Sequence, residues 1–345
     1  MTTIPDTFSA FRIYNDSDGY RAGVESISID DLSEGDVTIK VAWSSINYKD
    51  ALAGTGKGKI LKSYPLVGGI DVAGMVVESS DERYAEGDEV LVTGCEQSES
   101  RDGGYSQYLR LDANSIIPLP AGLTLREAMA LGTAGFTAAL CLYRMEANGQ
   151  TPDDGPIVVT GATGGVGSVA INLLAAAGYD VHAISGKVDQ FDYLEELGAS
   201  QCISRHDLHW GQRALEKARW AGCIDNVGGD MLSGISRVIK LWGNIASCGM
   251  AGGIGLQTTT MPFILRGVSL LGISSANCPY KIRVTVWDRL ANEWKPPHLD
   301  LICNKETNLD EMSGAFSTML KGSSLGRTVV NINGNSDIKG MKSKA

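Results

Sequence analysis

The sequence predicts an α/β protein in which a β-rich first domain is followed by a doubly wound parallel sheet. Short alternating apolar runs separated by Gly and Asp turns fill the chain up to about Leu131. From Ile157 onward, runs of strand length alternate with helix-like segments, which is the pattern of a parallel sheet. A last run, Gly326 to Ile332, has no place left in that sheet. We therefore expect it to return to the first domain.

Composition and charge exclude several classes of protein. A length of 345 residues allows about two domains with substantial cores. A net charge of −10 argues against nucleic-acid binding, and no run approaches the length of a membrane span. The first ten residues lack the cationic start and apolar segment of a secretion signal. The seven cysteines are scattered without a CxxC pair, so we expect reduced thiols, no structural zinc site and a cytoplasmic location.

The chain divides into four predicted parts. Residues 1–130 form the barrel-like first domain, and a small-residue helix beginning near Glu127 leads into residues 131–275, the second domain. Residues 276–332 return to the first domain, and residues 333–345 form a polar, mobile tail. The strands expected in the first domain are Val37–Val41, Val72–Val77 and Val90–Thr93.

Strands and helices alternate through the second domain and the returning segment. The expected strands are Ile157–Val159, Asp180–Ser185, a run near Cys202, Cys223–Val227, Asn244–Cys248 and Val268–Ile273. The expected helices are one ending near Ala177, then Asp189–Leu197, Gln212–Arg219, Met231–Leu241, Ile282–Trp294 and Leu309–Leu320.

A glycine-rich turn, Gly161 to Gly167, joins the first of these strands to its helix. Some of its glycines permit a tight turn with positive φ, and others leave room for backbone N–H groups to approach a pyrophosphate. A strand, a glycine turn, a small-residue helix and a second strand in this order form a dinucleotide-binding Rossmann unit.

The end of the second strand indicates which dinucleotide binds. An NAD-preferring site usually carries an acidic residue there, whereas this chain has Ser185, Gly186 and Lys187. A hydroxyl, an open position and a cation suit a 2′-phosphate. We therefore predict NADPH as the cofactor. Arg205 follows the third strand and either faces the same phosphate or is an ordinary solvated arginine.

Four longer motifs carry a resemblance to a known family. They are Trp43–Leu52 (WSSINYKDAL), Gly69–Gly74 (GIDVAG), Gly132–Ala138 (GTAGFTA) and Met261–Val268 (MPFILRGV). With the order of domains, they make the chain resemble the medium-chain dehydrogenase/reductase superfamily. Within it, the chain is similar to the acryloyl-CoA reductase family, whose members also carry the name quinone oxidoreductase. The likeness covers about residues 10–332.

The resemblance implies a GroES-like catalytic domain joined to a Rossmann NADP-binding domain. Zinc-dependent relatives carry a cysteine at Ser45 or a neighbour, and Gly-His-Glu where this chain has Gly69, Ile70 and Asp71. Gly322 stands where relatives can carry an asparagine that contacts the cofactor. The cofactor contacts implied by the family are Tyr48, Thr163, Gly164, Gly165, Val166, Ser185, Gly186, Lys187, Arg205, Met250, Ile264 and Ser275.

The main functional hypothesis is NADPH-dependent reduction of an α,β-unsaturated CoA thioester, acryloyl-CoA to propanoyl-CoA. Without the zinc ligands, addition of hydride to an already polarised C=C bond is favoured over alcohol oxidation. Tyr48 and Asn47 are the candidate catalytic residues. Tyr48 either donates a proton or only packs against the cofactor. Asn47 acts either in catalysis or as a structural amide.

Three other functions remain open. The runner-up is an NADPH-dependent quinone oxidoreductase, and a non-catalytic NADPH-binding protein is a further alternative. A hydrolase is suggested by the GxSxG match from Gly322 to Gly326. That motif requires a preceding strand and a following helix, whereas here a helix-like run precedes it and a strand follows.

Two surface features carry expectations about partners. Four lysines between Lys49 and Lys62, with Asp50 as the only acid, give this segment a charge of +4 − 1 = +3. Lys57 and Lys59 either receive the phosphates of CoA or belong to a solvated glycine-rich loop. The apolar run Val268–Ile273 would form the edge of the Rossmann sheet, so we expect a homodimer that pairs these strands across a two-fold axis.

Overall fold

The computed structural model describes residues 3–333. Two compact units divide the chain. Of the described residues, the first unit comprises 3–133, 279–284 and 303–333; the second comprises Ala134–Cys278 and Thr285–Ile302. Of the predicted tail, residues 333–345, only Asn333 lies within the described residues.

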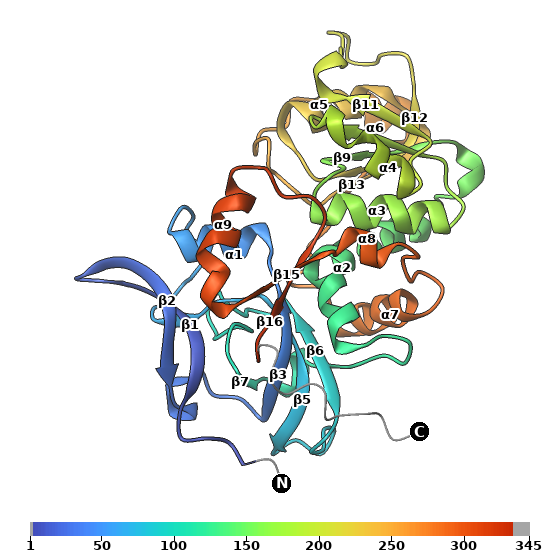
Figure 1. Cartoon of the computed structure of the whole chain (residues 1–345). Coiled ribbons are helices and arrows are strands. Elements are labelled where there is room, and N and C mark those ends of the chain that lie inside the picture. The colour runs from blue at the N-terminus through green and yellow to red at the C-terminus, as the bar shows by residue number, and fades with distance from the viewer. Residues whose placement is uncertain (1–2, 334–345) are drawn as a thin grey trace. The chain divides into compact units, whose positions relative to one another are not determined.

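The first unit is mostly β-structure (Figure 1). One sheet has the order β2-β1-β4, the other has the order β15-β16-β3-β5-β6-β8, and β7 also pairs with β3. Its helices are α1 (Tyr48–Thr55) and α9 (Met312–Leu320). Its strands are β1 (Phe8–Asp16), β2 (Gly19–Ile27), β3 (Val37–Ser45), β4 (Leu66–Val67), β5 (Asp71–Ser79), β6 (Glu89–Thr93), β7 (Tyr108–Leu111), β8 (Ile117–Pro118), β15 (Lys305–Asn308) and β16 (Thr328–Asn331).

The last described strand returns to this unit, as predicted. β16 pairs antiparallel with β3, with Val329 opposite Ser45 and Val330 opposite Ser44. The side chains of Val329 and Val330 are fully buried, so this return contributes to the core. Strand β15 pairs parallel with β16 and was not among the predicted strands.

Helix α1 begins directly after β3 because Asn47 and Asp50 cap it. The Asn47 side chain accepts from the third helical N–H, and the Asp50 carboxylate accepts from the Asn47 backbone N–H at 2.8 Å. The helix ends at Gly56, which has φ +68. This reciprocal cap holds Tyr48, the first residue of the helix, at the point where the chain leaves the sheet.

The second unit contains the parallel sheet. Its strand order, β11-β10-β9-β12-β13-β14, is that of a dinucleotide-binding fold. Its strands are β9 (Ile157–Thr160), β10 (Val181–Ser185), β11 (Gln201–Ser204), β12 (Trp220–Asp225), β13 (Ile239–Ser247) and β14 (Ser269–Gly272). Its helices are α3 (Gly165–Ala176), α4 (Phe191–Glu196), α5 (Gly229–Val238), α6 (Met261–Arg266) and α8 (Leu299–Ile302). The helices α2 (Leu125–Ala147) and α7 (Tyr280–Ala291) each pass from one unit into the other.

Two helix predictions in this unit are wrong. Residues 212–219 form no helix, because the backbone N–H groups of Glu216 and Arg219 donate to the carbonyls of Arg237 and Val238. The helix expected at Met231–Leu241 ends at Val238, and the chain enters β13 one residue later. In both places contacts between segments override helix-like periodicity.

Part of the expected return segment belongs with the second unit. Residues 285–302 are grouped there, whereas the sequence analysis assigned all of 276–332 to the first domain. The buried Trp287 ring stacks on Phe136 of α2, with ring centroids 6.1 Å apart and planes 10° apart. The side chain of Asn172 on α3 accepts from the His298 backbone N–H at 3.0 Å.

Candidate functional site

The glycine turn of the second unit has the shape that a pyrophosphate requires. Gly161 has φ +60, and a Cβ on Gly167 would lie 2.5 Å from the Gly161 carbonyl oxygen. Gly164 is the N-cap of α3 and supplies no side-chain cap. The first N–H groups of α3, from Gly165 and Val166 onward, are therefore available to an anion beside the buried Thr163.

The ends of β10 and β11 lie side by side and bring the predicted ribose-phosphate residues together. Ser185 and Ser204 are partners in the parallel register. The Ser185 hydroxyl accepts from the Lys187 backbone N–H at 3.0 Å, which shapes the turn after the strand. A Cβ on Gly186 would lie 2.5 Å from Nε of Arg205. The absence of a side chain at position 186 thus lets the Arg205 guanidinium lie across this turn.

The end of β12 contains a buried polar group that sequence reasoning missed. The fully buried Asp225 accepts from Thr160 Oγ1 at 2.7 Å and from the Gly228 N–H at 2.9 Å. Burial raises the pKa of Asp225, although these hydrogen bonds act in the opposite direction. Asn226 donates through its side chain to the Thr160 carbonyl at 2.7 Å. The two residues tie the end of β12 to the strand that precedes the glycine turn.

The remaining predicted cofactor residues of this unit are spread over three segments. Met250 follows β13 and is 68% exposed, at the edge of a hollow of ≈ 310 Å³. Ser275 follows β14, so it belongs to the same carboxyl edge of the sheet. Ile264 is 75% exposed on α6, which links β13 to β14; the last residue of that helix, Arg266, donates through Nη1 to the Ile239 carbonyl at the opposite edge of the sheet at 3.0 Å.

The first unit contains a buried polar cluster around Asp71. Its carboxylate accepts from Ser45 Oγ at 2.5 Å, from Asn47 Nδ2 at 2.8 Å and from Thr133 Oγ1 at 2.6 Å. Asp71 and Ser45 are fully buried, and Asn47 is nearly so. Asp71 belongs to the motif Gly69–Gly74, from which no role for this residue was predicted.

Arg327 completes this cluster from the far end of the sequence. Its guanidinium donates to Ser45 Oγ at 2.7 Å, to Asn47 Oδ1 at 3.0 Å and to the carbonyls of Ile46 and Ala130. Nη2 also lies 3.7 Å from the Asp71 carboxylate. Buried charges are tolerated when they are paired and fully hydrogen-bonded, as here. No pattern in the sequence connected Arg327 to Asp71.

Asp50 adds a second carboxyl group to the cluster. It accepts from the Asn47 side chain at 3.2 Å and from the Ile70 backbone N–H at 2.9 Å. Burial, followed by the nearby Asp71, raises the pKa of Asp50 to about 7. Burial also raises the pKa of Tyr105, whose hydroxyl donates to the Ser45 carbonyl at 3.0 Å.

The two predicted catalytic residues differ in exposure. The Tyr48 side chain is 54% exposed, whereas the Asn47 amide is buried and bonded to Asp50, Asp71 and Arg327. Asn47 therefore holds the cluster together through both atoms of its amide. Tyr48, next to it in the chain, is the accessible group.

The positive charge of the lysine-rich segment, Lys49 to Lys62, is partly neutralised by an acidic side chain. Glu99 forms ion pairs with Lys49 and Lys62. Within residues 3–333, neither Lys57 nor Lys59 has an ion-pair partner, and both are exposed. The cationic character of the segment thus comes from these two side chains.

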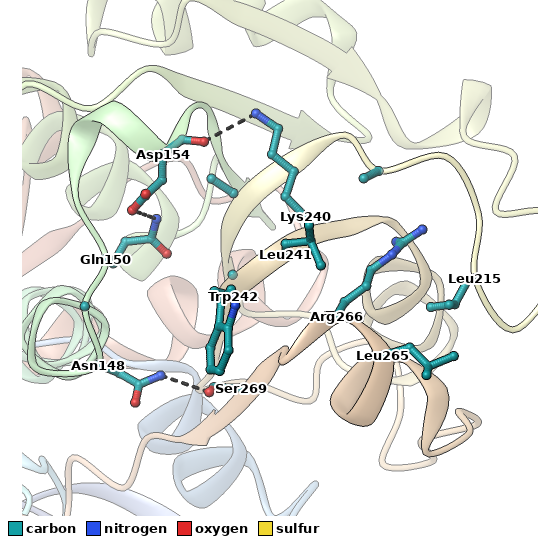
Figure 2. Close-up of a pocket in the computed structure, with 14 residues that line it drawn as sticks. Asn148, Gln150, Asp154, Leu215, Lys240, Leu241, Trp242, Leu265, Arg266 and Ser269 are labelled. Carbon is teal, nitrogen blue, oxygen red and sulfur yellow. Dashed lines mark hydrogen bonds between the residues drawn. The ribbon is translucent and has the colours of Figure 1, made fainter.

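A larger pocket lies at the opposite edge of the parallel sheet (Figure 2). Its volume is ≈ 950 Å³, and its lining includes Lys240 and Trp242 at the start of β13 and Ser269 at the start of β14. Lys240 donates to the Asp154 carbonyl at 3.4 Å, and Asn148 donates to Ser269 at 2.9 Å. Nucleotides bind at the carboxyl ends of such strands, so this pocket is separate from the cofactor residues.

The described residues also bear on metals and membranes. Among residues 3–333, no three His, Cys, Asp or Glu side chains are grouped so that they could hold a metal ion. None of the helices in that range combines the length and apolar character needed to cross a membrane.

Comparison with family models places two known domains on this chain. The model described as alcohol dehydrogenase GroES-like domain matches residues 33–121. The model described as zinc-binding dehydrogenase matches residues 165–292.

Relatives match over nearly the whole chain. YhfP of Bacillus subtilis, whose name calls it a quinone oxidoreductase, is 47% identical over 326 residues, 94% of this chain and 99% of its own. The acrylyl-CoA reductase AcuI of Ruegeria pomeroyi is 46% identical over 314 residues, 91% of this chain and 95% of its own. The solved YhdH oxidoreductase of Salmonella enterica, in complex with NADP, has a TM-score of 0.91 at 42% identity, covering 94% of this chain and all of its own. The structure of Bacillus subtilis YhfP, with NAD bound, has a TM-score of 0.92 at 46% identity, covering 95% of this chain and all of its own.

Proposed function

Because the chain belongs to the acryloyl-CoA reductase family of the medium-chain dehydrogenases/reductases, we propose that it reduces acryloyl-CoA to propanoyl-CoA with NADPH. The observation that carries the proposal is the nucleotide cradle of the second unit, where the glycine turn and the start of α3 suit the pyrophosphate of a hydride-carrying dinucleotide. A reductase of a polarised C=C bond needs a hydride donor and polar groups for the developing charge.

The second unit fits NADPH through its own residues. The N–H groups at the start of α3 would hold the pyrophosphate. Ser185, Lys187 and Arg205 would hold the 2′-phosphate, since Gly186 leaves the space in which the Arg205 guanidinium lies. NADP or NADPH is bound in solved YhdH structures, and NAD is bound in that of YhfP. Lys187 is the residue at which we test the preference of this chain.

When bound, the nicotinamide supplies a hydride for Cβ of the enoyl thioester. The thioester oxygen then carries enolate charge that a hydrogen-bond donor stabilises. Tyr48 is the exposed hydroxyl at the start of α1 and is our candidate donor. The bonds of Asn47 to Asp50, Asp71 and Arg327 support a positioning role, because they fix the residue that precedes Tyr48.

The polar cluster also bears on metal dependence. Zinc-dependent relatives have ligands at or beside Ser45 and in the segment that here ends at Asp71. In this chain the Arg327 guanidinium bonds to Ser45 and lies against Asp71, so a fixed cation already pairs with this carboxylate. Activity should therefore be unaffected by EDTA. Loss of activity in EDTA that zinc restores would contradict this.

The experiment that tests the function is a substrate panel that follows NADPH absorbance. Acryloyl-CoA, crotonyl-CoA and a benzoquinone are compared by kcat/KM. Preference for acryloyl-CoA supports the proposal. Preference for the quinone favours the alternative, a quinone oxidoreductase, which the name of YhfP suggests. No turnover with any of the three would favour a non-catalytic NADPH-binding protein.

We also propose that Lys57 and Lys59 receive the phosphates of CoA, since both are exposed and lack ion-pair partners within residues 3–333. The double substitution Lys57→Glu with Lys59→Glu should raise KM for acryloyl-CoA, most strongly at low ionic strength. Reduction of a small uncharged quinone should be nearly unchanged. Lys217→Glu with Lys305→Glu, at two exposed lysines outside this segment, makes the same change in net charge and serves as the control. An unaltered KM, or an equal loss with both substrates, would return the segment to a solvated loop.

The proposal also covers the oligomeric state and the cellular location. The protein forms a homodimer through β14, the edge strand of the parallel sheet, where Leu270 is 39% exposed. Exposed apolar side chains on neighbouring segments, including Leu241, Trp242 and Leu265, support an interface on this side of the unit. The seven cysteines are free thiols, which supports a cytoplasmic location.

A further inference from the structure

Three thiols of the second unit lie close together below the nucleotide edge of the sheet. Cys141 is on α2, Cys223 is on β12, and Cys248 directly follows β13. Cys141 and Cys223 are fully buried, whereas Cys248 is partly exposed and lines the hollow of ≈ 310 Å³ beside Met250. A small oxidant in that hollow can therefore reach Cys248 first.

The three thiols are not equivalent neighbours. Cys141 lies beside Cys248, because α2 runs along β13, and just beyond the end of α2 Asn148 Nδ2 donates to Asn244 Oδ1 of β13 at 2.6 Å. Cys223, on β12, is a more distant neighbour of Cys248. Cys248 also donates through Sγ to Asn226 Oδ1 at 3.1 Å and to the Asp225 carbonyl at 3.4 Å. Cys141 is thus the sulfur placed to react with an oxidised Cys248.

Cys248 is connected to the glycine turn through Asn226. The Asn226 side chain accepts from the Cys248 thiol and donates through Nδ2 to the Thr160 carbonyl at 2.7 Å, and the Asn226 backbone N–H donates to Thr160 Oγ1 at 3.0 Å. Thr160 is the residue directly before Gly161. A change at Cys248 therefore reaches the start of the pyrophosphate turn through two residues.

We propose that Cys141 and Cys248 are a redox modification site: hydrogen peroxide joins them in a disulfide that weakens nucleotide binding to this unit. The effect on binding rests on the proposed function, whereas the bond itself does not. The Cys248 sulfur attacks a peroxide oxygen, the O–O bond breaks, and a sulfenic acid and one water form. Cys141 then attacks the Cys248 sulfur, the S–O bond breaks, and a second water leaves. Two thiols lose two electrons, and one peroxide becomes two waters.

The disulfide would remove the support that Cys248 gives to Asn226. The bonded sulfur carries no hydrogen and is drawn to about 2.0 Å from the Cys141 sulfur, so the Asn226 side chain loses a donor. Loss of one such bond predicts an increase in the Kd for NADPH of about threefold or more. A thiol reductant should reverse the increase.

The test uses the full chain. Protein treated with hydrogen peroxide is blocked with N-ethylmaleimide and digested without reduction, and the linked peptides are identified by mass spectrometry. We expect a peptide pair joining Cys141 to Cys248, and a raised Kd for NADPH that dithiothreitol restores. A different linkage, a Cys248 sulfinic acid without linkage, or an unchanged Kd in linked protein would overturn the proposal.

A matched pair of variants separates this bond from general oxidation. Cys141→Ser should lose both the linkage and the response of the Kd to peroxide. Cys223→Ser, a buried neighbour in the same cluster, should keep both. Loss of the response in Cys223→Ser would contradict the assignment. If the proposed cofactor were wrong, the reduced protein would have no measurable affinity for NADPH. If only this proposal fails, that affinity is present and insensitive to peroxide.

Discussion

Asp50 caps helix α1, but its burial disfavours the ionised form of its carboxyl group. Its carboxyl accepts the Asn47 and Ile70 N–H groups, yet burial and the neighbouring Asp71 raise its pKa to about 7. In the unfolded chain its pKa lies near 4. Between about pH 4 and pH 7 the folded state therefore holds a proton that the unfolded state has released. Stability falls as pH rises through this window and levels off above it.

Asp50→Asn removes this titration, so its stability should depend less on pH than that of the parent protein. From pH 5 to pH 7 the parent should lose about 2 kcal/mol relative to the variant. Urea unfolding of both proteins at several pH values measures the difference. If the free energy of unfolding changed with pH in the same way in both proteins, Asp50 would not titrate as described. A constant difference in stability between the two proteins would not affect this conclusion.

Lys187 is the residue at which the choice of cofactor can be tested. It follows Ser185 and Gly186 at the end of β10, where a charge-assisted bond to a 2′-phosphate is worth roughly 1.5–3 kcal/mol. Lys187→Ala should reduce the preference for NADPH over NADH about tenfold or more, measured as the ratio of kcat/KM values. Lys217→Ala, an exposed lysine of the same unit, should leave the ratio unchanged. Equal kcat/KM for both cofactors in the parent protein would contradict the prediction.

At the scale of the elements, helix α2 is interrupted so that the buried cluster can form. Gly132 adopts φ 52 and ψ −155 inside the helix. A Cβ at this position would lie 2.5 Å from the Asp71 carboxylate, 2.6 Å from Arg327 Nη2 and 2.8 Å from Ser45 Oγ. The glycine is therefore required twice, for its backbone conformation and for the close approach of the ion pair.

Gly132→Ala should lower the free energy of unfolding by about 2–3 kcal/mol more than Gly87→Ala does. Gly87 lies in the same unit with φ +97, and a Cβ added there would meet no atom within 4 Å, so it carries the conformational cost alone. Urea unfolding of the two variants isolates the cost of the clash. Equal losses of stability in the two variants would contradict this prediction, because they would show that the side chains around Gly132 move aside for the added Cβ at no cost in free energy.

At the scale of the whole molecule, β14 leaves one edge of the parallel sheet open. The strand order ends at β14, and Leu270 on it is 39% exposed. Unpaired edge strands with apolar side chains favour pairing with a second copy, and charged side chains oppose it. The orientation of such a pair is two-fold, because each copy presents the same edge.

Leu270→Glu should convert a dimer into a monomer. Light scattering at micromolar concentration should give about twice the chain mass of 36.6 kDa for the parent and about one chain mass for the variant. Val24→Glu, an equally exposed residue on the edge strand β2 of the other unit, should leave the mass of the parent unchanged. A parent mass near 36.6 kDa would refute the dimer.

The nucleotide unit was largely predictable because its signals are local. The apolar run before Gly161, the glycines of the turn and the small residues of α3 are adjacent in the sequence, and each constrains the backbone at its own position. The alternation of strands and helices predicted a parallel sheet, and the terminal strand was correctly returned to the first unit. The helix expected at 212–219 failed because distant carbonyls on Arg237 and Val238 took its backbone donors.

The polar cluster could not be predicted in this way. Ser45 and Arg327 are hydrogen-bonded although they are 282 positions apart. The need for glycine at position 132 arises from the side chains of these residues, which lie too close for a Cβ there. The fold class, the nucleotide turn and the lack of the ligand residues of zinc-dependent relatives follow from the amino-acid order alone, because they depend on neighbouring residues. Two facts became visible only in the folded chain: Arg327 is the cation that pairs with Asp71, and both amide atoms of Asn47 are used in hydrogen bonds within the cluster. Burial and long-range contacts exist only once the chain has folded.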